Sequence, residues 1–236
     1  MTSRSLQSTD RPFVLVNMAM TADGKIATRS RGITSFGGEP DQQHLYELRA
    51  TVDAVMCGAR TLESAPVTLD NGGESFAKIR RQRGLSVHPL RVAVSGRGTL
   101  SPAATLFREG SAPILVLTTS LVPRRRLTML REQADAVWVG AGAQLDLPAA
   151  LRWLRSEWQV RRLLCEGGGA LNDAMFRAGL VDELHLTICP LVFGGRTAPT
   201  IADGRGHSQL ADCCRLRLTS CRRKGGDWFV VFRHSE

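Results

Sequence analysis

The sequence has no apolar run that approaches the ~20 residues of a membrane-spanning helix, which argues against an integral membrane protein. Its first residues, MTSRSLQSTDR, also lack the apolar centre of a secretory signal peptide, so we expect a cytoplasmic protein. Residues 1–11 are predicted to be a disordered lead-in. The hydrophobic content of 43% suits a globular core, and we expect a single domain over residues 12–236.

Paired metal-ligand motifs are missing as well. The six cysteines form no C-x-x-C pair, and no Cys/His spacing is typical of zinc, so the sequence predicts no metal site. The H-x-E and P-C-x-x-C signature of zinc deaminases is absent. Cys57, Cys165 and Cys189 lie in apolar, strand-like runs and are expected to be reduced, buried and hydrophobic in role.

Lysine and tyrosine are scarce, with three and one in the chain, although the formal net charge is +9. The many arginines form short, scattered clusters without the interleaved aromatics of a base-stacking surface, so nucleic acid is not the favoured partner. The charge is better suited to attracting an anionic small molecule. A non-catalytic, basic nucleotide- or nucleic-acid-binding protein is kept as an alternative.

Short apolar segments alternate with helix-like segments along the chain. We expect strands at 13–20, 52–57, 91–95, 114–119, 136–140, 163–166 and 183–189. Helices are expected at 41–50, after an N-cap at Asp146, and from the glycines at 167–169 to Gly179. The polar segment 62–90 is expected to be a loop insertion. This order predicts an α/β fold with a mostly parallel mixed sheet and a C-terminal antiparallel hairpin over Gly225-Gly226.

The segment 163–176, LLCEGGGALNDAMF, places three glycines between a strand and a helix, directly after Glu166. Glycine loses much conformational entropy on folding, so the run indicates a tight turn or a close approach of the backbone to a ligand. A helix N-terminus suits phosphate, but the pattern is neither G-x-G-x-x-G nor the P-loop motif. From these residues alone, a plain turn and a phosphate site both remain open.

Three segments share their order and spacing with one family: VNMAMTADGKIAT (16–28), GITS (32–35) with HLYELRATVDAVMCGARTL (44–62), and LLCEGGGALNDAMFRAGLVDELHLTICPLVFGG (163–195). Together they resemble the reductase domain of riboflavin biosynthesis in its stand-alone form. The resemblance implies a three-layer, dihydrofolate-reductase-like fold and an NADPH-dependent oxidoreductase. Its activity would be similar to that of 5-amino-6-(5-phosphoribosylamino)uracil reductase, with hydride transfer to the ribose C1 of a phosphoribosylamino-pyrimidine imine.

The resemblance also implies a homodimer formed through the sheet edge. The apolar C-terminal segment WFVVFR would be an exposed, aggregation-prone edge if nothing covered it.

Site roles follow from the resemblance by position. Glu166 is expected to act on the substrate, with Gly32, Thr34 and Arg49 on the same side. Arg97 is expected to bind the 2′-phosphate that distinguishes NADPH from NADH. The other expected cofactor-binding residues are Ala19, Thr61, Ser95, Gly96, Gly168, Gly169, Ala170, Leu171 and Asn172.

One segment departs from the family pattern. After the position of Thr61 the family typically has Asp-Asp-Pro, a Leu-Thr pair and a basic residue, whereas this chain has TLESAPVTLDNGG. Glu63 is the candidate to replace the missing catalytic acid. Alternatively, the chain reduces another acceptor, such as a pterin, a dihydrofolate-like compound or another imine.

Overall fold

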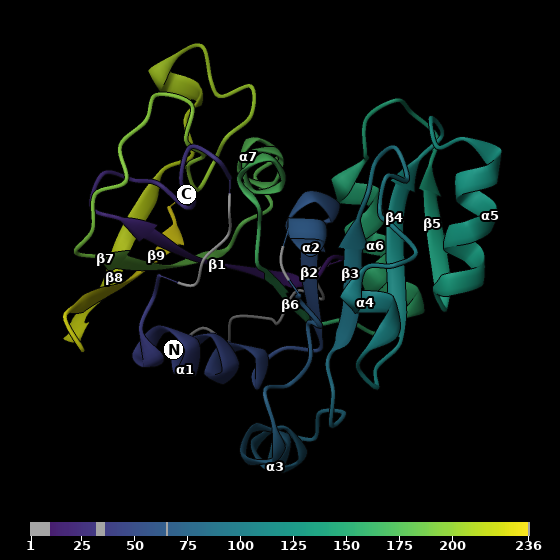
Figure 1. The fold of residues 1–236 in the computed structure, drawn as a ribbon, viewed down its shortest axis with the longest axis horizontal. Coiled ribbons are helices and arrows are strands. Elements are labelled where there is room, and N and C mark those ends of the chain that lie inside the picture. Colours follow the sequence, from purple (N-terminus) through teal and green to yellow (C-terminus); the bar gives the residue numbers. More distant parts are fainter. Residues whose placement is uncertain (1–9, 32–35, 65, 236) are drawn as a thin grey trace, which may run out of the picture.

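The computed structural model describes residues 10–31, 36–64 and 66–235. A nine-stranded sheet forms its centre, in the order β5-β4-β3-β2-β6-β1-β7-β9-β8 (Figure 1). The first seven strands in this order pair in parallel, and β9 and β8 pair antiparallel. The strands are β1 (Phe13–Thr21), β2 (Ala54–Gly58), β3 (Leu90–Val94), β4 (Ile114–Thr119), β5 (Ala136–Gly140), β6 (Arg162–Cys165), β7 (Glu183–Cys189), β8 (Leu216–Lys224) and β9 (Asp227–His234).

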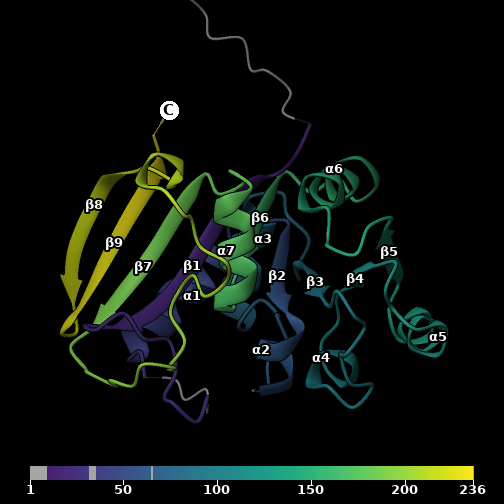
Figure 2. The same cartoon turned by 90° about the horizontal axis from the view of Figure 1, so that it is seen from above.

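Helices cover both faces of this sheet, so the fold has the three layers that were predicted (Figures 1 and 2). One apolar core contains side chains of α6 and α7, and the other contains side chains of α1, α2, α4 and α5. No helix of the described residues is long and apolar enough to cross a membrane. The helices are α1 (Glu39–Arg49), α2 (Ala59–Ser64), α3 (Glu74–Gln82), α4 (Thr105–Arg108), α5 (Arg124–Gln133), α6 (Leu147–Glu157) and α7 (Gly169–Arg177), with a 3-10 turn at Leu210–Asp212.

The central strands are apolar on both faces because both faces are covered. In β2, Ala54 and Met56 belong to the core under α6 and α7, while Val55 and Cys57 belong to the opposite core. Successive side chains of a strand point to opposite faces, so a strand buried on both sides must be apolar throughout. This explains why the short apolar runs of the sequence predicted the parallel strands to within about two residues.

The prediction of a loop insertion over 62–90 is wrong. The segment contains the end of α2 and the whole of α3. Helix α3 buries Phe76, Ala77 and Arg80, which lie on one helical face. Arg80 is fully buried and donates hydrogen bonds to backbone carbonyls, among them that of Val52 at 2.8 Å. A buried arginine gives a polar sequence pattern, and for this reason the helix was not recognised.

The C-terminal hairpin forms as predicted, but its outer strand is not the expected one. Strand β9, which contains WFVVFR, lies between β7 and β8, so the sheet edge is β8 (Figure 2). The expectation that WFVVFR forms the edge is therefore wrong.

Most of the expected N-terminal lead-in, residues 1–9, lies outside the described residues. Arg11, near its end, forms a two-bonded ion pair with Asp182, at 2.7 and 2.8 Å.

Candidate active site

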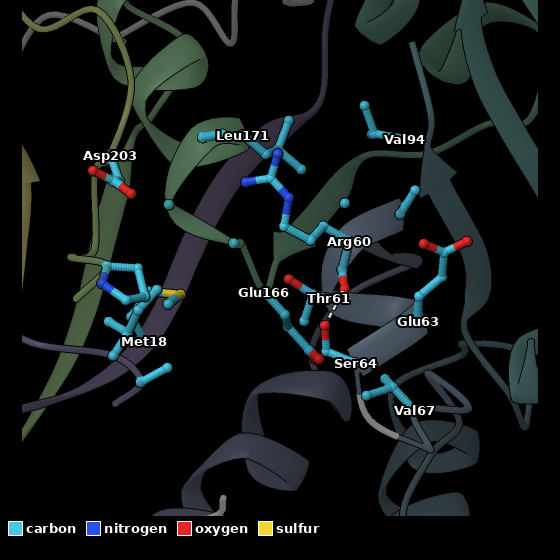
Figure 3. Close-up of a pocket in the computed structure, with 18 of the residues that line it drawn as sticks. Met18, Arg60, Thr61, Glu63, Ser64, Val67, Val94, Glu166, Leu171 and Asp203 are labelled. Carbon is cyan, nitrogen blue, oxygen red and sulfur yellow. Dashed lines mark hydrogen bonds between the residues drawn. The ribbon is translucent and has the colours of Figure 1, made fainter. Parts of the chain in front are cut away.

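A cavity of about 1030 Å³ opens at the carboxyl ends of β2, β3 and β6, beside the middle of β1 (Figure 3). Ligands of open α/β sheets bind in crevices outside the carboxyl ends of the strands. Small-molecule sites usually enclose roughly 300–1,000 Å³, so this cavity is large enough for an extended ligand and a second, smaller one. It is the candidate active site.

Most of the residues expected from the sequence meet at this cavity. Neither Arg97 nor Asn172 is among its lining residues, and Gly32 and Thr34 lie outside the described residues. Arg49 lies behind the wall and contacts the lining residue Glu166. The expected residues that line the cavity are Ala19, Thr61, Glu63, Ser95, Gly96, Glu166, Gly168, Gly169, Ala170 and Leu171.

Glu166 and Arg49 form a buried ion pair at the end of β6. Nε of Arg49 donates to one carboxylate oxygen and Nη2 to the other, both at 2.7 Å. The side chain of Arg49 is only 6% exposed and that of Glu166 is 11% exposed. Burial lowers the pKa of Arg49, but the Glu166 carboxylate raises it, and the net pKa lies above the ordinary value. The two hydrogen bonds from Arg49 therefore hold the Glu166 carboxylate in one orientation in the cavity wall.

At each of the three positions after Glu166, a side chain is disfavoured for a different physical reason. Gly167 has a φ of +76°, which side chains rarely adopt, and a Cβ there would lie 2.8 Å from the sulfur of Met18. Gly168 has an ordinary φ of −72°, and its Cβ would lie 2.9 Å from the Thr61 hydroxyl. A Cβ on Gly169 would overlap the carbonyl oxygen of Thr200. The turn therefore needs glycine for backbone conformation and for close packing against Met18, Thr61 and Thr200.

The first turn of α7 faces the cavity with free backbone donors. The amides of Leu171 and Asn172 bond to the carbonyl of Gly168, at 2.9 and 3.1 Å. Those of Gly169 and Ala170 have no acceptor among the described residues, as expected at a helix N-terminus, and both residues line the cavity. These two N–H groups can bind an anion.

The side chain of Asn172 has a structural contact instead of facing the cavity. Its amide nitrogen donates to the carbonyl of Ile201 at 2.8 Å, and its oxygen accepts a weak hydrogen bond from Cys165. This fixes the segment near residue 201 against α7. A direct role of Asn172 in cofactor binding remains a prediction.

The end of β3 presents backbone more than side chain. The buried hydroxyl of Ser95 accepts a hydrogen bond from the amide of Leu100 at 3.3 Å, and Gly96 and Thr99 line the cavity. Arg97 is exposed and is not part of the lining. Its proposed contact with a 2′-phosphate remains a prediction.

The two predicted catalytic acids are not brought together. One carboxylate oxygen of Glu63 accepts a hydrogen bond from the amide of Ser101 at 2.9 Å. In Figure 3 this carboxylate points toward β3 and away from Glu166. The structure thus ties Glu63 to the 99–101 segment, which argues against its acting beside Glu166.

Sequence reasoning missed several polar lining residues, among them Asn17, Asp41, Arg60 and Asp203. Burial raises the pKa of Asp41 above its ordinary value. One side-chain oxygen in each of Asn17 and Asp41 is buried without a hydrogen-bond partner among the described residues. Arg60 directly precedes Thr61, so its sequence position alone could have suggested it.

The cysteines are all free, and Cys57, Cys165 and Cys189 are buried as predicted. Burial raises the pKa of Cys165 to about 12, so this thiol stays neutral. Within the described ranges, no group of three or more His, Cys, Asp or Glu residues could hold a metal ion.

Comparison with known proteins gives one consistent family. A model of the RibD C-terminal domain matches residues 12–230. The 2,5-diamino-6-ribosylamino-4(3H)-pyrimidinone 5′-phosphate reductase of Methanothermobacter thermautotrophicus is 35% identical over 222 residues, which are 94% of this chain and 98% of that protein. The riboflavin biosynthesis protein RibD of Chlamydia trachomatis is 30% identical, over 90% of this chain and 55% of the relative.

Solved structures agree on the fold. Acinetobacter baumannii RibD matches with a TM-score of 0.77 and 22% identity, over 97% of this chain and 59% of that chain. A pyrimidine reductase-like protein from Corynebacterium diphtheriae matches with a TM-score of 0.76 and 23% identity, over 95% and 92% of the two chains. The predicted dihydrofolate-reductase-like fold is confirmed.

Proposed function

Because the chain belongs to the RibD C-terminal domain family, we propose that it is a nicotinamide-dependent reductase of riboflavin biosynthesis. The proposed substrate is 2,5-diamino-6-ribosylamino-4(3H)-pyrimidinone 5′-phosphate, since reductases named for this compound match this chain over almost their whole length. The structural observation that carries the proposal is the Glu166 carboxylate, which Arg49 holds from behind and which lines one large cavity together with the N-terminus of α7.

The lining residues fit a nicotinamide dinucleotide. Gly169 and Ala170 offer backbone donors for its phosphates, and Thr61 lies beside Gly168 with its hydroxyl at the cavity. Ala19 and Met18 from β1 offer an apolar wall suited to a nicotinamide ring. We propose NADPH as the cofactor, with Ser95 and Gly96 near the adenosine end. When bound, the dinucleotide supplies a hydride.

The chain's own contribution to the reaction is electrostatic. The acceptor carbon of a ribosylamine is the ribose C1 of its open-chain imine, which accepts hydride most readily as a cationic iminium. The Glu166 carboxylate stabilises that positive charge, and the iminium already carries the proton that the product amine retains. Arg49 holds the carboxylate in one orientation through two hydrogen bonds, so it acts as a positioning residue.

The experiment is an assay of NADPH oxidation with three acceptors: the diaminopyrimidinone phosphate, its deaminated counterpart and dihydrofolate. We expect turnover with the first. Turnover with dihydrofolate alone would replace the proposed substrate by a pterin-like one. No oxidation with any acceptor, together with salt-sensitive binding to DNA, would favour the non-catalytic alternative.

We further propose a homodimer. Strand β8 leaves the sheet with an unpaired edge in the described chain, and Leu218 and Trp228 of the hairpin are 53% and 48% exposed. The test is light scattering at micromolar concentration. A particle of 25.7 kDa, the mass of one chain, would contradict the proposal.

A further inference from the structure

Arg60 is a cation at the cavity that the family resemblance did not assign. It is the second residue of α2, directly after the end of β2, and it lines the cavity. The residue is exposed, and its guanidinium has no hydrogen bond or ion pair in the described part of the chain. Its backbone carbonyl accepts a hydrogen bond from the hydroxyl of Ser64. By contrast, each of the three guanidinium nitrogens of Arg49 donates a hydrogen bond, two to Glu166 and one to the carbonyl of Asp70.

The side chain of Arg60 points toward the N-terminus of α7. In Figure 3 the guanidinium extends from α2 toward Leu171, in the first turn of α7. Its nearest acidic neighbour along α2, Glu63, points the other way and is bonded to the amide of Ser101. The free charge of Arg60 and the free amides of Gly169 and Ala170 therefore border the same part of the cavity.

We propose that Arg60 binds the pyrophosphate of the dinucleotide cofactor, together with the backbone amides of the α7 N-terminus. This inference rests on the proposed function, which supplies the dinucleotide. A guanidinium is suited to the task because it can donate two parallel hydrogen bonds to phosphate oxygens.

The pyrophosphate is a better match than the 2′-phosphate. The 2′-phosphate is expected at the end of β3, beside Ser95 and Gly96, whereas Arg60 points toward α7 (Figure 3). The distinction is measurable, because NADPH and NADH share the pyrophosphate and differ only in the 2′-phosphate. A pyrophosphate ligand must affect both cofactors equally.

The test is calorimetric titration of NADPH and NADH into the parent chain and into Arg60→Ala, Arg60→Lys and Arg97→Ala. We expect Arg60→Ala to weaken both cofactors by the same factor, about 10- to 100-fold, as for the loss of a charged hydrogen bond. Arg60→Lys should recover part of the affinity. Arg125→Ala is the matched control, because it removes the same charge from an exposed residue of α5 that lies outside the cavity.

Other titration results would contradict the proposal in different ways. Loss of affinity for NADPH alone would assign Arg60 to the 2′-phosphate, and unchanged affinity for both cofactors would remove it from the site. An equal loss of cofactor affinity in Arg125→Ala would show that the effect comes from the net charge of the protein and not from a contact made by Arg60. Circular dichroism confirms that each variant is folded; should Arg60→Ala not fold, Arg60→Gln is titrated in its place. A parent chain that binds neither cofactor would overturn the proposed function itself, and with it this inference.

Discussion

Two neighbouring segments of the molecule present different groups at the same cavity. The β6–α7 turn, residues 166–169, and residues 58–64, which are the end of β2 and the whole of α2, follow adjacent parallel strands at the same edge of the sheet. The first presents backbone amides and a carboxylate locked by Arg49. The second presents the long, free side chain of Arg60 and a carboxylate, Glu63, that is tied elsewhere. The first segment therefore holds its carboxylate in place by hydrogen bonds, whereas the second leaves one basic side chain unbonded.

The largest effect is expected on stability, from removal of the arginine that holds Glu166 in the β6–α7 turn. Arg49→Ala would leave the buried carboxylate of Glu166 without its partner, which typically costs about 3–5 kcal/mol of unfolding free energy. Urea denaturation measures this. The paired variant Arg49→Met with Glu166→Leu should be markedly more stable than Arg49→Ala, because no buried charge remains; a loss as large as in the single variant would contradict the account.

Glu166→Gln should separate chemistry from binding. We expect turnover to fall about 10²- to 10³-fold, as when one electrostatic contact to a developing charge is removed, with the affinity for NADPH unchanged. Stopped-flow turnover and calorimetry measure the two quantities. Turnover close to that of the parent would remove Glu166 from the reaction.

Gly168→Val should abolish cofactor binding while the fold is kept. A branched side chain would enter the space between Thr61 and the α7 N-terminus, where the phosphates are proposed to lie. Calorimetry with circular dichroism tests this. Gly168→Ala is the milder probe, and Gly142→Ala is the control, since Gly142 has only ordinary neighbours and lies outside the cavity. If Gly168→Val binds NADPH like the parent chain, the glycines serve only to form the turn.

Glu63→Gln should have the smallest effect. Its carboxylate bonds to the amide of Ser101 and points away from Glu166, so we expect turnover to change by less than about 3-fold, as for most substitutions at exposed sites. A loss as large as that of Glu166→Gln would restore Glu63 as the replacement for the missing acid.

The parts of the site that could be predicted are those that depend on local pattern. Glu166 and the glycines were found because a strand, an acid and a glycine run follow one another in the sequence. Arg49 was assigned to the same side of the site as Glu166 only through the family resemblance, since 117 positions separate the two residues. Its role beside the substrate remains a prediction. Helix α3 and the direction of Glu63 could not be predicted, because each depends on contacts with distant segments: Arg80 with Val52, and Glu63 with Ser101.

The sequence by itself determined the strands, the main helices and the glycine turn, because hydrophobic periodicity and backbone conformation are local properties. Tertiary structure alone decided which charges meet. It joined Arg49 to Glu166, turned Glu63 away and left Arg60 free beside α7. The physical reason is that electrostatic interactions depend on distance in space and on burial, and neither is recorded in the order of residues.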